Sequence, residues 1–233
     1  MITLEEQIID DIRRKNFGIG IDTGKLPQEV QEHIEYKKRF TDKVSNLIKD
    51  LYSSKLHFIL ELIQNADDND YDSNFEPKLN IIIQRDKIII QNNETGFNEK
   101  HIRALCSIGD TTKLNRTSGY IGEKGIGFKS VFLITDKPHI YSNGFRFKFE
   151  YNKEEPQSII IPCWINEKPD FIKKDETNII LYLKDDVINN KDFYSGIEPK
   201  VLLFLKKLKG ITIKDDINSR NSEMKLSREN GIT

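Results

Sequence analysis

The sequence has few of the features that mark membrane, secreted or nucleic-acid-binding proteins. No apolar run approaches the ~20 residues of a membrane-spanning helix, and the first residues, MITLEE, lack the basic and apolar regions of a signal peptide. The net charge is −1, from 36 basic and 37 acidic side chains of interspersed sign. No basic stripe is present, which argues against a direct nucleic-acid partner. Because a membrane span and a signal peptide are also missing from the sequence, we expect a soluble, cytoplasmic protein without a membrane partner.

Cysteine is also scarce. Cys106 and Cys163 are the only two, they lie far apart in the sequence, and their spacing fits no metal site. We interpret them as buried thiols in a reducing compartment. The sequence has no internal repeat or low-complexity tract, and 233 residues suffice for one domain with appendages.

Hydrophobic periodicity and turn residues predict helices first and a hairpin-rich sheet afterwards. The Asn143-Gly144 pair between two apolar runs is a strong hairpin signal. This order favours an α+β protein, a two-layer α/β sandwich with a mostly antiparallel sheet and helices on one face. The predicted helices cover residues 4–15, 27–51, about 53–68, 98–106, 126–134 and 190–208, and the predicted strands cover 79–84, 87–91, 138–142, 145–151, 158–162, 178–184 and 210–214.

Glycine is concentrated in one place: four of the thirteen glycines fall within residues 119–127, in the stretch GYIGEKGIGFKS. A glycine-rich loop that opens a helix exposes backbone N–H groups to an anion, so the first hypothesis is a phosphate site. The stretch fails the Walker pattern because Phe128 displaces Lys129 and Ser130 by one position. It fails the dinucleotide pattern because Ser130 replaces the third glycine. The preceding residues 107–124 are polar and form a predicted loop that is long enough to be functional.

A second group of polar residues lies in LHFILELIQNADD, residues 56–68. On a helix, Glu61, Asn65 and Asp68 stack on one side, opposite an apolar side. An ordinary amphipathic helix explains this pattern as well as a functional site does. A carboxylate one turn from an amide oxygen can, however, position water beside a hydrated magnesium ion, whose ligands are hard oxygens.

Two weaker signals lie at the ends of predicted strands. Residues 92–97, NNETGF, are compatible with an ordinary turn or with polar groups that face a ligand at the end of a strand. Thr177 begins a strand, a common position for threonine with no function attached.

Taken in this order, the four segments resemble the motifs of the GHKL superfamily of gyrase B, the ninety-kilodalton heat-shock chaperones, histidine kinases and MutL. ELIQNADD is similar to the first motif, IIIQNNETGF to the second, GEKGIGFKS to the third, and the strand led by Thr177 to the fourth. Within this superfamily the phrases HFILELIQNADD, RALCSIGDTTK and GYIGEKGIGFKSVF resemble most the ATPase domains of sacsin and NO VEIN type. The resemblance implies a Bergerat-fold domain that binds ATP and Mg²⁺.

For the first motif, the resemblance implies that Glu61 is the general base for the attacking water. Asn65 would ligate Mg²⁺ through its side-chain oxygen, and Asp68 would line the same pocket.

For the third motif, the resemblance implies that Gly122, Gly125 and Gly127 hold the phosphates by their backbone N–H groups. Residues 107–124 would form a lid over ATP, from which Lys113 or Lys124 would reach the phosphates. It also places Gly96, Ile126 and Phe128 in the nucleotide pocket.

The second motif departs from the superfamily pattern, because Asn92 replaces the aspartate that reads adenine and Glu94 replaces a glycine. An asparagine carbonyl can accept a hydrogen bond from the adenine amine, but its NH₂ group could equally meet the guanine carbonyl. Asn93 is the second candidate for this contact, and Thr177 would bind the base directly or through water. Base selectivity is therefore open at the level of sequence.

We expect an ATPase whose lid closure moves attached domains or drives ATP-dependent homodimerisation. Two alternatives are a nucleotide-binding switch without significant hydrolysis and, because His33 lies on a predicted helix, histidine-kinase-like phosphotransfer. We expect a helical extension at 1–25, the ATP-binding domain at 26–215, and at 216–233 a polar tail or a linker to further domains of a longer polypeptide.

Overall fold

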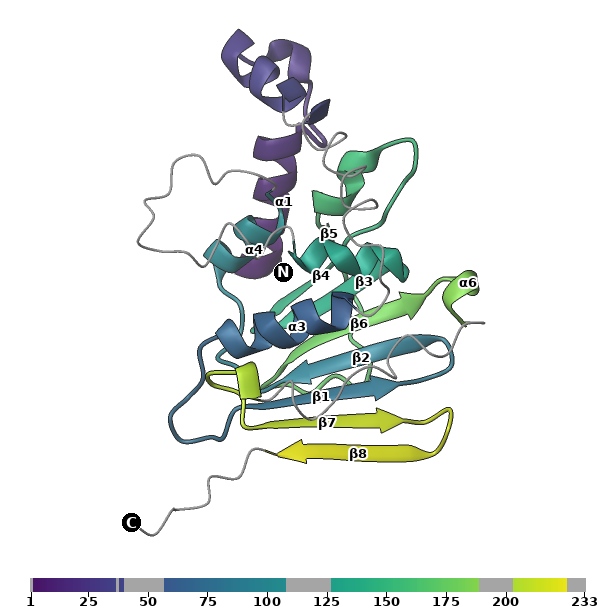
Figure 1. Ribbon diagram of the computed structural model, residues 1–233. Helices are drawn as coiled ribbons and strands as arrows, with labels where there is room; N and C mark the ends of the chain where they lie inside the picture. Colours follow the sequence, from purple (N-terminus) through teal and green to yellow (C-terminus); the bar gives the residue numbers. More distant parts are fainter. Residues whose placement is uncertain (1, 37, 40–56, 108–126, 189–202, 226–233) are drawn as a thin grey trace.

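The computed structural model describes residues 2–36, 38–39, 57–107, 127–188 and 203–225. Within these residues, eight strands form one sheet in the order β5-β4-β3-β6-β2-β1-β7-β8 (Figure 1). Neighbouring strands run antiparallel except for β1 and β7, which are parallel. The strands are β1 (Lys78–Ile83), β2 (Lys87–Asn92), β3 (Thr135–Ser142), β4 (Phe145–Lys148), β5 (Cys163–Trp164), β6 (Thr177–Leu183), β7 (Gly210–Asp215) and β8 (Arg220–Lys225).

The helices lie on one face of this sheet, with α3 next to β6 and β2 (Figure 1). They are α1 (Leu4–Phe17), α3 (His57–Asp68) and α4 (Glu99–Leu105), with the short α6 (Asp185–Ile188) at the end of β6. Residues 28–36 and 38–39 are also helical. Three 3₁₀ turns complete the elements: η1 (Thr23–Lys25), η3 (Lys129–Leu133) and η4 (Pro156–Ile160). The predicted two-layer α+β sandwich with a mostly antiparallel sheet is confirmed.

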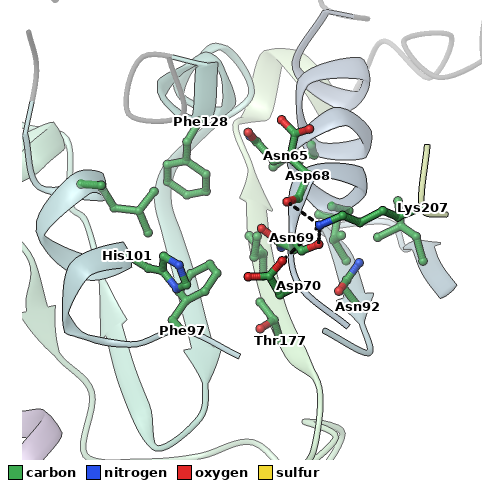
Figure 2. A pocket seen from close by; sticks show the side chains of 17 residues that line it. Asn65, Asp68, Asn69, Asp70, Asn92, Phe97, His101, Phe128, Thr177 and Lys207 are labelled. Carbon is green, nitrogen blue, oxygen red and sulfur yellow. Dashed lines mark hydrogen bonds and ion pairs between the residues drawn. The ribbon is translucent and has the colours of Figure 1, made fainter. Parts of the chain in front are cut away.

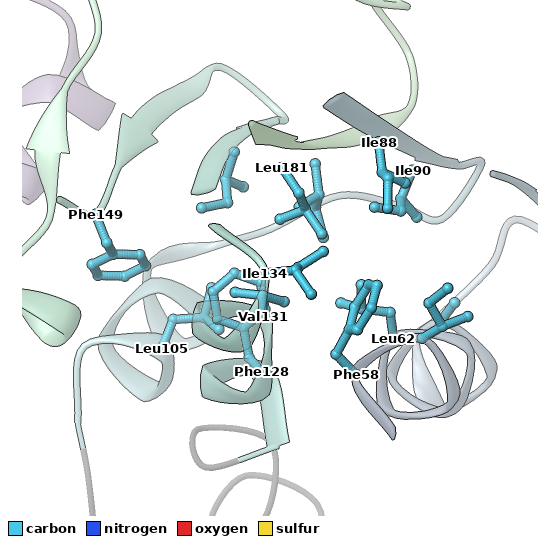
Figure 3. Packing of buried hydrophobic residues seen from close by; sticks show 14 of the residues in the cluster. Phe58, Leu62, Ile88, Ile90, Leu105, Phe128, Val131, Ile134, Phe149 and Leu181 are labelled. Carbon is cyan, nitrogen blue, oxygen red and sulfur yellow. The ribbon is translucent and has the colours of Figure 1, made fainter. Parts of the chain in front are cut away.

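The core lies between the helices and the sheet. Phe58 and Leu62 of α3 point toward Ile90 of β2 and Leu181 of β6, while Val131 of η3 fills the space beside them (Figure 3). Phe58, Val131 and Leu181 are fully buried. Burial of a phenylalanine or leucine side chain contributes about 1.5–3 kcal/mol, so this layer fixes α3 on the sheet.

Helix α1 belongs to the same core. Its N-cap Thr3 accepts a hydrogen bond from the Glu6 amide at 3.2 Å, and the helix ends at Gly18, whose φ of 67° only glycine adopts readily. Ile9 and Ile12 are buried in the main core cluster. The division of the chain at residue 25 stays a prediction.

The hairpin predicted from Asn143-Gly144 joins β3 to β4. Asn143 and Gly144 both have positive φ, 45° and 86°, as a two-residue hairpin turn requires. β3 and β4 pair from Ser142↔Phe145 to His139↔Lys148, so β4 is shorter than the predicted strand 145–151.

Three predictions about secondary structure were wrong in the described residues. Residues 158–162 were expected as a strand, but residues 156–160 form η4, because Pro156 sits at its first turn and the Ser158 amide donates to the Glu155 carbonyl at 2.8 Å. Residues 126–134 were expected as a helix; residues 127 and 128 are α-helical and Lys129–Leu133 are 3₁₀, so the helical conformation is present and only the helix type was wrong for most of the segment. Of the predicted helix 190–208, residues 189–202 lie outside the described part, and 205–208 are not helical.

Within the segment 216–233, which was expected as a polar tail or a linker, the structure has a strand that sequence analysis did not predict. Arg220–Lys225 form β8, which pairs antiparallel with β7 along its full length. Only Met224 of this strand is buried. Because β8 is an edge strand with polar residues at nearly every position, its sequence has no apolar alternation from which a strand could be predicted.

Candidate functional site

Helix α3 lies with its apolar side on the sheet and its polar side toward a cavity. Phe58, Ile59 and Ile63 are buried, whereas Glu61, Asn65 and Asp68 are half-buried. Asn65 and Asp68 line the cavity directly. The helical spacing noted in the sequence therefore places Asn65 and Asp68 on a concave surface, whereas Glu61 is not among the described residues that line the cavity.

The cavity has a volume of about 380 Å³ and lies between α3, α4 and the ends of β2 and β6 (Figure 2). This volume falls within the range of about 300–1,000 Å³ that is usual for small-molecule sites. Its walls are mostly apolar, and the residues that line it include Leu62, Ile90, Phe97, Leu105 and Phe128. A flat apolar ligand fits such walls, and polar groups at few positions would fix its orientation.

Register in the sheet brings the second and fourth sequence motifs together. Asn92, the last residue of β2, pairs with Thr177, the first residue of β6. Both side chains line the cavity, and both residues are buried, with 4 % and 3 % exposure. Thr177 shares a hydrogen bond of 2.5 Å with Ser142 of β3, whose Oγ also accepts from the Phe97 amide at 2.8 Å. These contacts hold Thr177 rigidly at the cavity floor.

The Asn92 amide is engaged at both ends. Its Nδ2 donates to the Tyr71 hydroxyl at 2.6 Å, and its Oδ1 accepts from the Glu94 amide at 2.8 Å. Tyr71 in turn donates to the Ala66 carbonyl at the end of α3, at 2.7 Å. Burial raises the pKa of Tyr71, and the Asn92 hydrogen bond opposes this only in part. Tyr71 was not among the predicted site residues.

Asn93 is not among the described residues that line the cavity. Its Oδ1 accepts from the Lys78 amide at 2.7 Å, and its Nδ2 donates to the Glu76 carbonyl at 2.9 Å. Both ends of this amide therefore secure the start of β1. The structure brings Asn92, and not Asn93, to the described cavity wall.

Gly96 is not among the described residues that line the cavity. Its φ is 87°, and a Cβ built there would lie 2.7 Å from Cβ of Asn143 in the β3–β4 turn. Glycine is required at this position because the backbone is left-handed and the turn lies against it.

Gly127 of the third motif lies in contact with Glu61 of the first motif. A Cβ built on Gly127 would overlap Oε2 of Glu61, so the two residues touch across the gap between α3 and the segment that leads into η3. Phe128 then points into the cavity (Figure 2). The other predicted phosphate and lid residues, Lys113, Gly122, Lys124, Gly125 and Ile126, lie outside the described part of the chain.

Lys129 does not belong to the described cavity wall. It is fully buried, its Nζ donates to the Ile159 carbonyl at 2.8 Å, and it lies 3.9 Å from the centroid of the Phe149 ring. Burial lowers the pKa of Lys129 to about 7 and raises the pKa of the neighbouring Cys106 thiol to about 12. Lys129 thus differs from a Walker lysine, which reaches a phosphate.

Asp67 and Lys207 form a part of the site that sequence analysis missed. The buried Asp67 carboxylate accepts from the backbone amides of Lys206, Lys207 and Leu208 at 2.7–2.8 Å. Lys207 lies on the cavity wall, and its Nζ donates to the Asn69 carbonyl at 2.6 Å and pairs with Asp70 at 3.1 Å (Figure 2). The carboxylate of Asp67 thereby anchors the segment that leads into β7 beside the end of α3.

The sequence held a signal for Asp67, because this carboxylate follows Ile59 and Ile63 at helical spacing on the apolar side of α3. A charged residue at a core position needs a buried partner. Lys207 gives no such signal, since its partners lie far away in the sequence.

Family comparison agrees with the site geometry. The family model described as the Sacsin domain matches residues 37–161, which is more than half of the chain. The chain belongs to the sacsin domain family. The resemblance to heat-shock-ninety-like GHKL domains of sacsin and NO VEIN type is confirmed by this match and by the relatives below.

Relatives of this sacsin domain are much longer proteins. The chain is 36 % identical over 227 residues to Protein NO VEIN of Arabidopsis thaliana, and this alignment covers 89 % of the chain and 8 % of the relative. It is 31 % identical over 134 residues to the chaperone protein HtpG of Borreliella afzelii, covering 46 % of the chain and 22 % of the relative. HtpG of Campylobacter jejuni is 26 % identical over 244 residues, 84 % of the chain and 37 % of the relative. The chain thus spans well under half the length of these relatives. The family match together with the HtpG relatives identifies it as a nucleotide-binding module of GHKL type.

Two further observations concern the described residues alone. No helix among them is long and apolar enough to cross a membrane. No group of three or more His, Cys, Asp or Glu side chains in the described ranges is placed to bind a metal ion by itself.

Proposed function

We propose that this sacsin domain binds ATP with Mg²⁺ and hydrolyses it slowly. The observation that carries the proposal is the convergence of three motifs on one cavity: Asn65 and Asp68 from α3, Asn92 from β2, and Thr177 from β6. Gly127, the last glycine of the third motif, lies against Glu61 of α3.

The apolar walls suit the purine ring, because Leu62, Ile90 and Phe128 line the cavity and offer aliphatic and aromatic surface for the faces of a planar base. The polar floor formed by Asn92 and Thr177 would then read the edge of the base. The phosphates would extend along α3 toward Gly127, whose segment continues into the glycine-rich stretch.

Asn65 is suited to hold Mg²⁺ because its amide oxygen is a hard ligand, and Mg²⁺ in nucleotide sites needs few protein ligands besides phosphate and water. The bound ion would neutralise phosphate charge. Glu61 lies one helical turn before Asn65 and next to Gly127, where a carboxylate can orient a water molecule and accept its proton.

A carboxylate at position 61 favours hydrolysis over phosphotransfer to histidine. His33 is exposed on the helical segment 28–36, and no contact connects it with the described cavity wall. We further propose that the domain works within a longer polypeptide, where lid closure would move attached domains or drive ATP-dependent homodimerisation.

The test compares nucleotide binding with phosphate release for the chain and two Glu61 variants. Glu61→Ala should retain ATP binding in calorimetry and lose hydrolysis by a factor on the order of 10²–10⁴, the usual contribution of a general base. Glu61→Gln keeps the shape of the side chain and should behave in the same way, because it cannot accept the proton. Equal loss of binding and hydrolysis would refute the general-base role.

A companion variant tests the metal ligand. Asn65→Ala should abolish the difference between ATP affinities measured with Mg²⁺ and with EDTA. An unchanged Mg²⁺ dependence would remove Asn65 from the metal site. Binding of ATP by the wild-type chain without any phosphate release would make the domain a nucleotide switch.

A further inference from the structure

The Asn92 side chain poses a question of base selectivity. An amide carries a donor and an acceptor of similar size, so an asparagine that is free to rotate can meet the amine of adenine or the carbonyl of guanine. The contacts around Asn92 decide which end faces a base.

The oxygen end of the amide is fixed by Glu94. The backbone N–H of Glu94 can only donate, and it lies 2.8 Å from Oδ1 of Asn92. A rotated amide would place its NH₂ group against this N–H, with two donors facing each other.

The nitrogen end is fixed by Tyr71. The Tyr71 hydroxyl has one proton, which it donates to the Ala66 carbonyl at 2.7 Å, a group that can only accept. Its lone pairs therefore face Asn92, and they accept from Nδ2 at 2.6 Å. Because burial raises the pKa of Tyr71, the hydroxyl keeps its proton at physiological pH and this polarity does not change.

The two contacts leave the Asn92 oxygen as the group presented to a base. In Figure 2 this oxygen lies on the side of the amide that faces Thr177, and the nitrogen lies on the opposite side. Asn92 is only 4 % exposed, so solvent cannot replace either contact cheaply if the amide rotates.

We infer that Tyr71 is a specificity-determining residue of this nucleotide site: by holding the Asn92 nitrogen, it makes the amide present an acceptor, which selects a 6-amino purine over a 6-oxo purine. The inference rests on the proposed function. Tyr71 is a positioning residue, because it acts on the base through Asn92. The pair Tyr71–Asn92 reproduces with a neutral amide the acceptor that an aspartate would provide.

The experiment measures the affinities of ATP, GTP and ITP for the wild-type chain, Tyr71→Phe and a control. ITP isolates the 6-position, because it lacks the 2-amino group of GTP. The wild-type chain should prefer ATP over ITP. Tyr71→Phe should lower this preference by about tenfold, the equivalent of one lost hydrogen bond, because the amide can then rotate at the cost of a single contact.

Tyr182→Phe is the matched control. Tyr182 lies on β6, in the small cluster of Ile89, Tyr141, Ile172 and Ile180, and is not part of the described cavity wall. This variant removes a hydroxyl from the same sheet and should leave the ATP-to-ITP ratio unchanged. A general structural defect would weaken both nucleotides equally, and the ratio distinguishes it from a change in selectivity.

A second background keeps the test decisive if Tyr71→Phe folds poorly. In Asn92→Asp the carboxylate has two equivalent acceptor oxygens, so its orientation does not matter and the adenine preference should persist. Adding Tyr71→Phe to Asn92→Asp should not reduce the ATP-to-ITP affinity ratio. An ATP-to-ITP ratio that Tyr71→Phe leaves unchanged in the Asn92 background would overturn the inference, as would equal wild-type affinities for ATP and ITP. Absence of binding by any nucleotide would instead overturn the proposed function and this inference with it.

Discussion

Gly127→Ala is the substitution that most directly probes the contact between the two halves of the proposed catalytic site. The added methyl group would overlap Oε2 of Glu61. The rest of the protein need not move, because the overlapped atom is the end of a flexible side chain on a half-buried helix position. The perturbation therefore falls on the position of the carboxylate and much less on the stability of the fold.

The size of the effect follows from the displacement. The carboxylate must withdraw by about 1 Å before carbon and oxygen reach van der Waals separation. A misplacement of about 1 Å in a catalytic group can cost about 10²-fold in rate, which corresponds to about 2.7 kcal/mol in the barrier. We expect kcat for ATP hydrolysis to fall by about this factor, with at most a few-fold change in ATP affinity.

The assay combines steady-state phosphate release with calorimetric ATP binding and thermal unfolding. Gly210→Ala is the matched control, because a Cβ built there meets its nearest atom, the Met224 carbonyl oxygen, at an ordinary 3.7 Å. This variant should hydrolyse ATP at the wild-type rate. The reasoning would be refuted if Gly127→Ala retained the wild-type kcat, or if it lost ATP binding and hydrolysis in the same proportion.

Two further predictions concern buried charges. Asp67→Ala leaves the amides of Lys206, Lys207 and Leu208 without their acceptor. Urea denaturation should show a free energy of unfolding that is lower by about 3 kcal/mol. Asp10→Ala removes an exposed aspartate on α1 and should change this free energy little; similar losses in the two variants would contradict the anchoring role. Burial lowers the pKa of Lys129 to about 7, so between pH 7 and about 10.5 the unfolded chain binds one more proton than the folded chain, and stability from this residue rises with pH by about 1.4 kcal/mol per unit. Lys129→Met should therefore be more stable than wild type at pH 7, and its advantage should shrink toward pH 10; an advantage that is constant with pH would show that Lys129 is not protonated differently in the two states.

The parts of the fold that were predictable from sequence are those set by local chemistry. The Asn143-Gly144 turn, the spacing of Glu61, Asn65 and Asp68, and the strand led by Thr177 all depend on residues close in sequence. The strand predicted at 158–162 failed because an apolar run cannot by itself distinguish a strand from a tight 3₁₀ turn, and Pro156 decided in favour of the turn.

The parts of the site that were not predictable depend on distant contacts. Nothing local indicates that Tyr71 would orient Asn92, because Tyr71 lies in a polar loop and its partners are Ala66 and Asn92. Lys207 reaches the cavity only because Asp67 binds its segment from more than a hundred residues away. The choice between Asn92 and Asn93 was likewise open until the structure placed Asn92 on the cavity wall and tied Asn93 to the start of β1.

The position of β6 in the sheet has a consequence for how the domain can be divided. β6 pairs with β2 on one side and β3 on the other, yet it follows the segment 37–161 that the family model matches. A fragment that ended at residue 161 would contain only the hairpins β1–β2 and β3–β4, because β5, β6, β7 and β8 all follow that residue. Without β6, nothing would join β2 to β3, and each of the four remaining strands would keep one unpaired edge. Such edges invite pairing between chains, so a boundary chosen from sequence similarity alone would yield an aggregating fragment. An expressed domain must extend past Leu183 to join the two hairpins through β6, past Leu208 to hold Asp67 of α3, and through β7 to cover the edge of β1.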